Sequence, residues 1–181
     1  MRARNRTIVT GTIGFVLGTL VTTALVRGQG APTKLAGEFG HVAMVVSDVE
    51  KSARTFADIF GVSVPPPRVI KNIPFPPGSP NAGKTMGTKT TFLQANGMNL
   101  ELIEPLDGPS PWRDFLEKNG EGVHHIAFTV PEWAPMVKFL ESKGGTWVQG
   151  TEEFDFGYVD LTQQLGFTVE VMGPNVNLPA Q

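Results

Sequence analysis

The chain has 181 residues, of which 15 are Lys or Arg and 17 are Asp or Glu, so its formal net charge at pH 7 is −2. This length is enough for one domain with a substantial hydrophobic core. The sequence contains no cysteine, which excludes disulfides, thiolate metal ligands and a cysteine nucleophile.

Residues 1–30 differ in composition from the rest of the chain. Three arginines lie within the first six residues, and residues 7–26 then carry no charge. A basic start followed by an apolar segment is typical of a signal peptide or an N-terminal membrane anchor. Because the arginines precede the apolar segment, we expect the following domain to be exported (periplasmic or extracellular) or anchored to the membrane through this segment alone. Removing the segment's arginines leaves an acidic domain, which argues against a nucleic-acid partner.

The remainder of the chain contains a repeat. The stretches 41–64 and 125–148 each open with His, an apolar residue and Ala, continue as a short apolar strand and then change to helical spacing. The apolar positions at helical spacing are Ala53, Phe56, Ala57 and Phe60 in the first copy, and Trp133, Met136, Val137 and Leu140 in the second. Ser47 and Glu50 have the spacing of a capping box at the start of the first helix.

Both copies continue with the same order of elements. The sequence predicts short strands at 61–64 and 145–149, longer strands at 87–94 and 156–163, tight turns at 95–97 and 164–166, and final strands at 99–106 and 168–173. The first copy also holds an insertion, residues 64–84, whose Pro and Gly content predicts an irregular loop of the kind that can form a lid. Ser110 as N-cap and Pro111 in the first turn predict a linker helix over 110–119.

The predicted fold class is therefore α+β, with two βαβββ modules in one domain over residues 40–173. Module one covers 40–106, the linker helix covers 110–119, and module two covers 123–173. Two copies of a small unit usually share one core and one site between them.

The alternation of side chains along strands selects one of the two adjacent histidines at 124 and 125. His41 and His125 open equivalent strands, and small residues follow each of them on the same face of the strand. The large apolar residues of these strands take the other face, against the helices. A shift of one residue moves a side chain to the opposite face, so His124 is predicted to point away from His125.

The final strands of the two modules each carry one carboxylate on the face of the histidines. Glu101 lies between two leucines and Glu170 between two valines, so each points away from the apolar face of its strand. An unpaired carboxylate in such a position is costly, and a metal ion would remove that cost. His41, Glu101, His125 and Glu170 are thus candidate ligands of one divalent ion, for which Zn, Co, Ni, Mn and Fe are all suitable.

At these residues the chain resembles the vicinal oxygen chelate superfamily, which includes glyoxalase I, methylmalonyl-CoA epimerases, extradiol dioxygenases and bleomycin-resistance proteins. Residues 40–173 are similar to this group, and the stretch 100–130 is most similar to the epimerases. The resemblance implies paired modules that form a cupped mixed sheet around one divalent metal, held by the same four residues. It further implies an isomerase or epimerase-like enzyme that transfers a proton α to a carbonyl of a small oxygenated substrate, with Glu170 as an acid/base.

The resemblance has one departure and leaves alternatives open. The epimerases carry a second carboxylate on the third strand of module one, and the stretch 87–94 has none. An extradiol-type dioxygenase and a non-catalytic protein that binds a small molecule are the alternative functions. No cofactor other than the metal is indicated, and a homodimer is compatible with the superfamily.

Overall fold

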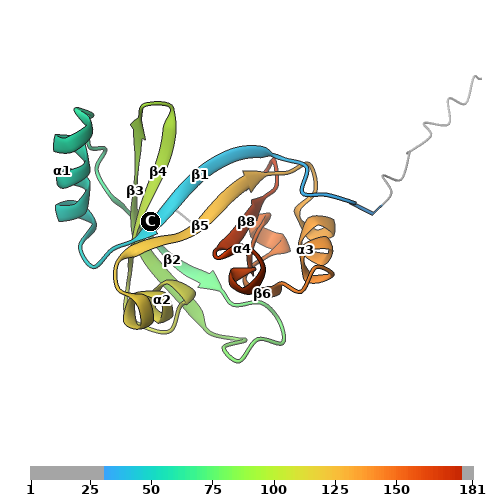
Figure 1. The fold of residues 1–181 in the computed structure, drawn as a ribbon. Helices are drawn as coiled ribbons and strands as arrows, with labels where there is room; N and C mark the ends of the chain where they lie inside the picture. The colour runs from blue at the N-terminus through green and yellow to red at the C-terminus, as the bar shows by residue number, and fades with distance from the viewer. Residues whose placement is uncertain (1–30, 177–181) are drawn as a thin grey trace, which may run out of the picture.

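The computed structural model describes residues 31–176, which form two βαβββ modules joined by a helix (Figure 1). Module one consists of β1 (Glu38–Val45), α1 (Val49–Phe60), β2 (Arg68–Pro74), β3 (Thr85–Ala95) and β4 (Met98–Pro105). The linker helix is α2 (Pro111–Asn119). Module two consists of β5 (Gly122–Thr129), α3 (Trp133–Glu141), β6 (Thr146–Thr151), η1 (Glu152–Phe154), β7 (Phe156–Asp160), α4 (Thr162–Leu165) and β8 (Thr168–Met172).

All eight strands belong to one curved sheet in the order β2-β3-β4-β1-β5-β8-β7-β6. The first strand of each module pairs in parallel with the last strand of the same module, and β1 pairs with β5 in antiparallel fashion. The edge strands β2 and β6 contact each other, so the sheet is nearly closed. The predicted α+β fold class and cupped mixed sheet are confirmed.

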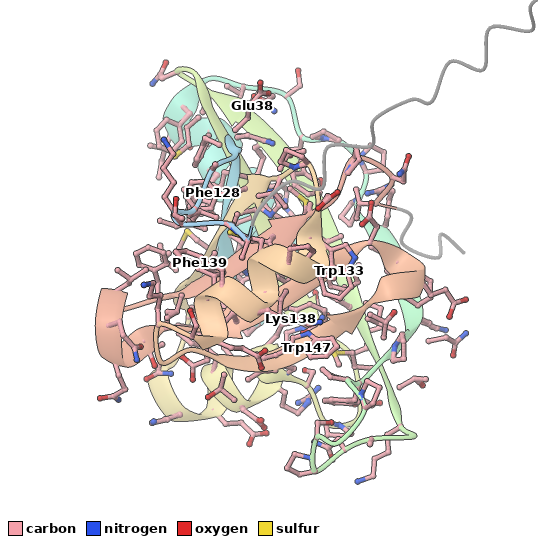
Figure 2. The ribbon with its side chains drawn as sticks, turned by 90° about the vertical axis from the view of Figure 1, so that its right-hand side faces the viewer. Glu38, Phe128, Trp133, Lys138, Phe139 and Trp147 are labelled. Atoms are coloured by element: carbon pink, nitrogen blue, oxygen red, sulfur yellow. The ribbon has the colours of Figure 1, made fainter. Side chains whose placement is uncertain are left out.

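The two module helices cover the outer face of the sheet. Helix α1 packs on the outer face of module one through Val49 and Ala53, against Leu100 and Leu102 of β4. Helix α3 packs on module two through four buried residues, Trp133, Met136, Val137 and Leu140. Figure 2 looks onto α3, where Trp133 and Trp147 lie side by side with ring centroids 5.8 Å apart. These apolar contacts keep the histidine-bearing face of each strand on the inside.

The start of α1 differs from the prediction. Its N-cap is Asp48, whose carboxylate accepts a hydrogen bond from the backbone N–H of Lys51 at 2.9 Å. Ser47 instead contacts Glu121, and Glu50 forms an ion pair with Lys89. The prediction of a capping box was therefore wrong, because both of its side chains interact with residues elsewhere in the chain.

The second strand of module one also differs from the prediction. Residues 61–64 form no strand, and β2 lies at Arg68–Pro74, within the insertion that was predicted to be irregular. Three prolines at 65–67 cannot donate to a sheet, so pairing with β3 begins only after them. The linker helix, in contrast, begins at Pro111 with Ser110 as its N-cap, as the sequence predicted.

None of the helices between residues 31 and 176 is long and apolar enough to cross a membrane. The signal peptide or anchor that was predicted at residues 1–30 lies outside the described residues.

Candidate metal centre

The four candidate ligands lie together on the inner face of the sheet, on four adjacent strands. β4 carries Glu101, β1 carries His41, β5 carries His125 and β8 carries Glu170. All four are buried, with exposed fractions of 8%, 5%, 0% and 4%, respectively. The alternation argument thus placed these side chains on the correct face, and the curvature of the sheet brings them together.

The contacting atoms of this quartet surround one point. Nε2 of His41 lies 3.3 Å from Nε2 of His125, 3.1 Å from Oε2 of Glu101 and 3.2 Å from Oε2 of Glu170. Nε2 of His125 lies 3.8 Å and 3.3 Å from the same two carboxylate oxygens. Each histidine therefore directs Nε2 toward the other histidine and toward both carboxylates.

The two carboxylates differ in their surroundings. The hydroxyl of Thr90 donates to Oε1 of Glu101 at 2.7 Å and orients that side chain. Oε2 of Glu170 is buried and makes no contact with hydrogen-bond geometry to any described residue, although both imidazoles lie beside it. Burial of a carboxylate oxygen without a hydrogen bond costs folding free energy. A cation or a proton donor bound to this atom would remove that cost.

The pKa values of His41 and Glu170 also indicate that positive charge is favoured in the quartet. Burial disfavours protonation of His41, but Glu101 and Glu170 outweigh burial and raise the pKa of His41 to about 10. Burial likewise favours a neutral Glu170, but His125 and His41 outweigh it and lower the pKa of Glu170 to about 2. The two carboxylates thus draw a proton onto His41, and a cation could replace that proton.

These observations fit a divalent metal ion. His41, Glu101 and His125 offer one ligand atom each within 4.8 Å of one another, and Oε2 of Glu170, 3.2 Å and 3.3 Å from the two imidazoles, offers a fourth. Two neutral imidazoles and two carboxylates have the charge that balances a divalent cation and suit Zn²⁺, Fe²⁺, Mn²⁺, Co²⁺ or Ni²⁺. The donor set does not select among these metals.

His124 does not point away from His125, so this part of the prediction was wrong. Strand β5 has a bulge at this point: Ala43 of β1 pairs with His125 and the next residue, Met44, pairs with Val123. His124 is the extra residue of the bulge, and a bulge breaks the strict alternation of side chains. Nδ1 of His124 lies 3.0 Å from Nδ1 of His125, which is a hydrogen-bond distance.

The surroundings of His124 are largely apolar. Its ring meets that of Phe115 edge to face at a centroid distance of 5.2 Å, and its exposed fraction is 5%. Burial and the nearby His125 lower the pKa of His124 to about 3. His124 is therefore neutral at physiological pH and can serve as a hydrogen-bond partner of His125.

Sequence reasoning missed the roles of Thr90 and His124. The threonines of 87–94 were visible in the sequence, but the position of a hydroxyl beside Glu101 depends on the pairing of β3 with β4. The bulge that redirects His124 depends on the pairing of β1 with β5, and it has no local signature in the sequence.

Comparison with known proteins identifies the family. The family model described as the glyoxalase/bleomycin resistance protein/dioxygenase superfamily matches residues 40–158. The chain belongs to this superfamily.

The curated relatives within this superfamily that match the chain include epimerases. The mitochondrial methylmalonyl-CoA epimerase of Mus musculus is 28% identical over 116 residues, which cover 64% of this chain and 58% of the relative. The ethylmalonyl-CoA/methylmalonyl-CoA epimerase of Cereibacter sphaeroides is 30% identical over 99 residues, which cover 54% of this chain and 64% of the relative. The matched part thus spans less than two thirds of either relative.

Solved structures show the same fold. The crystal structure of methylmalonyl-CoA epimerase from Mycobacterium tuberculosis superposes with a TM-score of 0.55 at 21% identity, covering 79% of this chain and 91% of the other. This likeness, at such low identity, concerns the fold. The chemistry has to be argued from the quartet itself.

Proposed function

We propose that this protein is a divalent-metal-dependent enzyme that transfers a proton α to a carbonyl group of a small oxygenated substrate, as an epimerase or isomerase does. The single observation that carries the proposal is the buried quartet of two histidines and two glutamates, in which one carboxylate oxygen has no hydrogen bond. Membership of a superfamily with epimerases among the matching relatives supports it.

The binding of the metal would use His41, Glu101, His125 and Glu170. A divalent ion in this position supplies positive charge to the substrate oxygen that becomes negative when the α-proton leaves. The apolar core that surrounds the quartet keeps water away, which strengthens each of these electrostatic interactions.

Glu170 is the proposed general base. Its low pKa keeps the carboxylate ionised at neutral pH, so the oxygen that is not used as a metal ligand is able to accept a proton. The proton passes from the substrate carbon to the Glu170 carboxylate, the electron pair of the C–H bond moves toward the carbonyl oxygen, and reprotonation reverses the two movements.

Inversion of the carbon requires a second group on the other side of the substrate. The buried carboxylates among the described side chains are Glu101 and Glu170, which come from opposite modules. The inner face of β3, where the epimerases carry their second carboxylate, holds Thr88 and Thr90 at this level. Glu101 is therefore the proposed donor for the opposite face.

The test is the exchange of α-hydrogen with solvent. The full-length protein, loaded with Co²⁺, is incubated in D₂O with methylmalonyl-CoA and, separately, with the N-acetylcysteamine thioester of methylmalonate. Deuterium incorporation is followed by proton NMR and inversion by circular dichroism of the substrate. Metal-dependent exchange in either substrate supports the proposal, and the absence of exchange from both overturns it for acyl thioesters.

Three matched variants assign the roles. We expect Glu170→Gln to slow exchange by about 10²–10⁴-fold, because it removes the base. Glu101→Gln keeps an oxygen donor for the metal and should retain exchange while losing inversion. Glu104→Gln is the control, since Glu104 lies on the outer face of the same strand and accepts a hydrogen bond from the backbone of Val49. Equal loss in Glu170→Gln and Glu104→Gln would contradict the assignment.

A further inference from the structure

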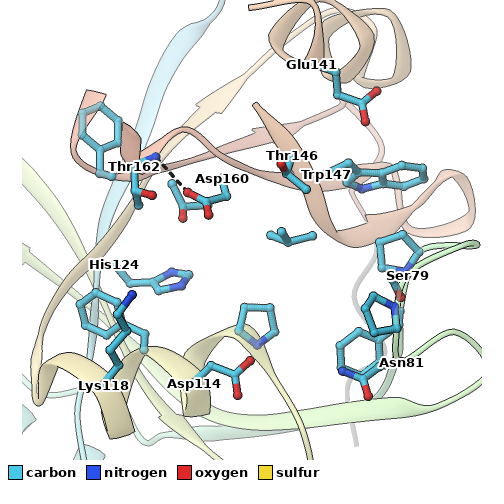
Figure 3. A pocket seen from close by; sticks show the side chains of 18 of the residues that line it. Ser79, Asn81, Asp114, Lys118, His124, Glu141, Thr146, Trp147, Asp160 and Thr162 are labelled. Atoms are coloured by element: carbon cyan, nitrogen blue, oxygen red, sulfur yellow. Dashed lines mark hydrogen bonds between the residues drawn. The ribbon is translucent and has the colours of Figure 1, made fainter. Parts of the chain in front are cut away.

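A pocket of about 640 Å³ opens beside the quartet, between α2, α4, β6 and the loop that connects β2 to β3 (Figure 3). Aromatic side chains form much of its wall: Phe75, Phe115, Trp147 and Phe167. This volume lies within the range of small-molecule sites. None of the four quartet residues lines the pocket, but His124 does, and Figure 3 shows its imidazole reaching into it.

His124 links the pocket to the quartet through its two ring nitrogens. Nδ1 lies 3.0 Å from Nδ1 of His125 and is the only hydrogen-bond partner of that atom within residues 31–176. The other nitrogen, Nε2, has no hydrogen-bond partner among the same residues. His124 lines the pocket with an exposed fraction of 5%, so this nitrogen is free to bond to a group in the pocket.

The contact between the two rings couples their tautomers, because only one of the two Nδ1 atoms can carry the hydrogen of this bond. His125 presents Nε2 to the quartet, so a metal ion bound there leaves the hydrogen of His125 on Nδ1. With that metal bound, the hydrogen would be donated to Nδ1 of His124, which would then carry none. The hydrogen of neutral His124 would therefore lie on Nε2, where it can be donated to a group in the pocket.

The charged residues of the pocket restrict what it can hold. Asp114, Glu141 and Asp160 line it against one ammonium group, that of Lys118. The resulting negative potential disfavours a phosphate-bearing group such as coenzyme A, whereas the aromatic wall favours a flat apolar group. A hydrogen-bond acceptor on that group would satisfy Nε2 of His124.

We propose that this pocket binds an uncharged aromatic group that bears a carbonyl or similar acceptor, and that His124 is the positioning residue that joins this group to His125. In taking the occupant to be the non-reacting end of the substrate, the inference rests on the proposed function and narrows its substrate class to neutral aromatic carbonyl compounds. The binding itself is independent of any reaction.

The first test uses prodan, a neutral naphthyl ketone whose fluorescence reports the polarity of its surroundings. We expect the full-length, Zn²⁺-loaded protein to bind one prodan per chain, and His124→Phe to weaken binding about tenfold through the lost hydrogen bond. Trp147→Ala should weaken it to a similar extent, because it removes part of the aromatic wall. His124→Gln keeps a donor and should recover part of the affinity.

Charge is tested with a second dye and with coenzyme A. Anilinonaphthalene sulfonate, which is aromatic but anionic, should bind at least tenfold more weakly than prodan, and Asp114→Asn should improve its binding. Glu117→Gln, on the same helix but outside the pocket, is the matched control and should have no effect. Displacement of prodan by coenzyme A, or absence of prodan binding from a folded protein, would overturn the proposal.

The second test reads the tautomer directly. The chain has three histidines, so ¹⁵N-labelled histidine gives few ring signals, and His124→Phe identifies those of His124. In the Zn²⁺-loaded protein we expect the hydrogen of His124 on Nε2, with a shift of this signal when prodan is added. A hydrogen on Nδ1 of His124, or no response to bound prodan, would refute the link to His125.

The two proposals can fail separately. If α-hydrogen exchange is absent from both thioesters and from bound prodan, whose propionyl group carries α-hydrogens, while prodan binding and the tautomer are as expected, the proposed reaction is wrong and the binding function of the pocket stands. If exchange occurs with methylmalonyl-CoA at full rate and prodan does not bind, the reaction stands and the substrate class inferred from the pocket is wrong.

Discussion

The two modules contribute the same pair of ligands but surround them differently. The residue before each ligand histidine is the extra residue of a bulge in the β1–β5 pair: Gly40 before His41, and His124 before His125. Module one has no side chain at this position, and module two has an imidazole. The bulge thus allows module two, but not module one, to connect its ligand to a neighbouring pocket.

The carboxylates show a second difference of the same kind. Thr90 and Phe156 are equivalent, since each lies two residues before the direct partner of its module's glutamate. Thr90 holds Glu101 by a hydrogen bond, whereas Phe156 offers no donor to Glu170. Module one therefore fixes its carboxylate, and module two leaves one oxygen unpartnered. The two halves of the repeat thus support equivalent carboxylates in different ways.

The largest expected effect is the loss of metal affinity when the ligand histidine of either module is replaced. His41→Ala or His125→Ala should lower metal affinity by more than about 100-fold, because loss of an outer hydrogen-bond partner alone costs 10–100-fold. Metal content after dialysis, measured by elemental analysis, checks this. Retention of a stoichiometric metal by either variant would show that the quartet is not the metal site.

The hydrogen bond that orients Glu101 in module one can be removed by mutation. Thr90→Val removes the hydroxyl beside Glu101 and should lower metal affinity about tenfold, since it leaves Oε1 of Glu101 without this donor. Competition with a chromogenic chelator measures the affinity. Thr91→Val is the matched control, because Thr91 bonds to the backbone of Pro65 on the outer side. Equal losses in the two variants would show that Thr90 acts only through general stability.

The bulge residue of module one should not accept a side chain. A Cβ added at Gly40 would lie 3.2 Å from the carbonyl oxygen of Ala127 and 2.9 Å from Cε of Met172. Gly40→Ala should therefore cost about 1–3 kcal/mol of unfolding free energy. Gly122→Ala, at which the nearest atom to the added Cβ is 3.9 Å away, should be close to neutral. Urea denaturation of both variants decides the matter, and equal stabilities would refute a steric reason for Gly40.

The module helices should respond differently to loss of their N-cap side chains. Asp48→Ala removes the hydrogen bond to Lys51 N–H and should cost about 1 kcal/mol. Glu132→Ala should cost almost nothing, since Glu132 makes no side-chain hydrogen bond at the start of α3. The same denaturation experiment measures both. A large cost for Glu132→Ala would mean that the two helices are capped alike.

The smallest expected effect concerns a contact across the modules. Glu121 accepts hydrogen bonds from the hydroxyl and the backbone N–H of Ser47, which lower the pKa of the Glu121 carboxyl. A lowered pKa stabilises the folded state above the ordinary pKa of the group, and this stabilisation is lost as pH falls through the folded pKa. Glu121→Gln should thus destabilise the protein by less than about 1 kcal/mol at pH 7 and not at all in acid. Thermal unfolding at both pH values checks the sign, and a difference that grows in acid would contradict it.

The sequence by itself determined the features that depend on local periodicity. Helical spacing located α1 and α3, the Ser-Pro signal located α2, and the alternation of side chains put His41, Glu101, His125 and Glu170 on one face. These predictions succeeded because the period of a strand or a helix is a property of the chain alone. The repeat of the pattern also indicated that the four side chains share one site.

Only the tertiary structure decided the features that depend on pairing between distant strands. The bulges at Gly40 and His124 exist because β1 and β5 are out of step by one residue over a short stretch. The hydrogen bond from Thr90 and the contact of Ser47 with Glu121, which leaves Asp48 as the cap, likewise follow from partners elsewhere in the chain. The face on which a side chain lies follows from its position along its own strand. A bulge is a mismatch between two paired strands, so it can be identified only from the structure of both.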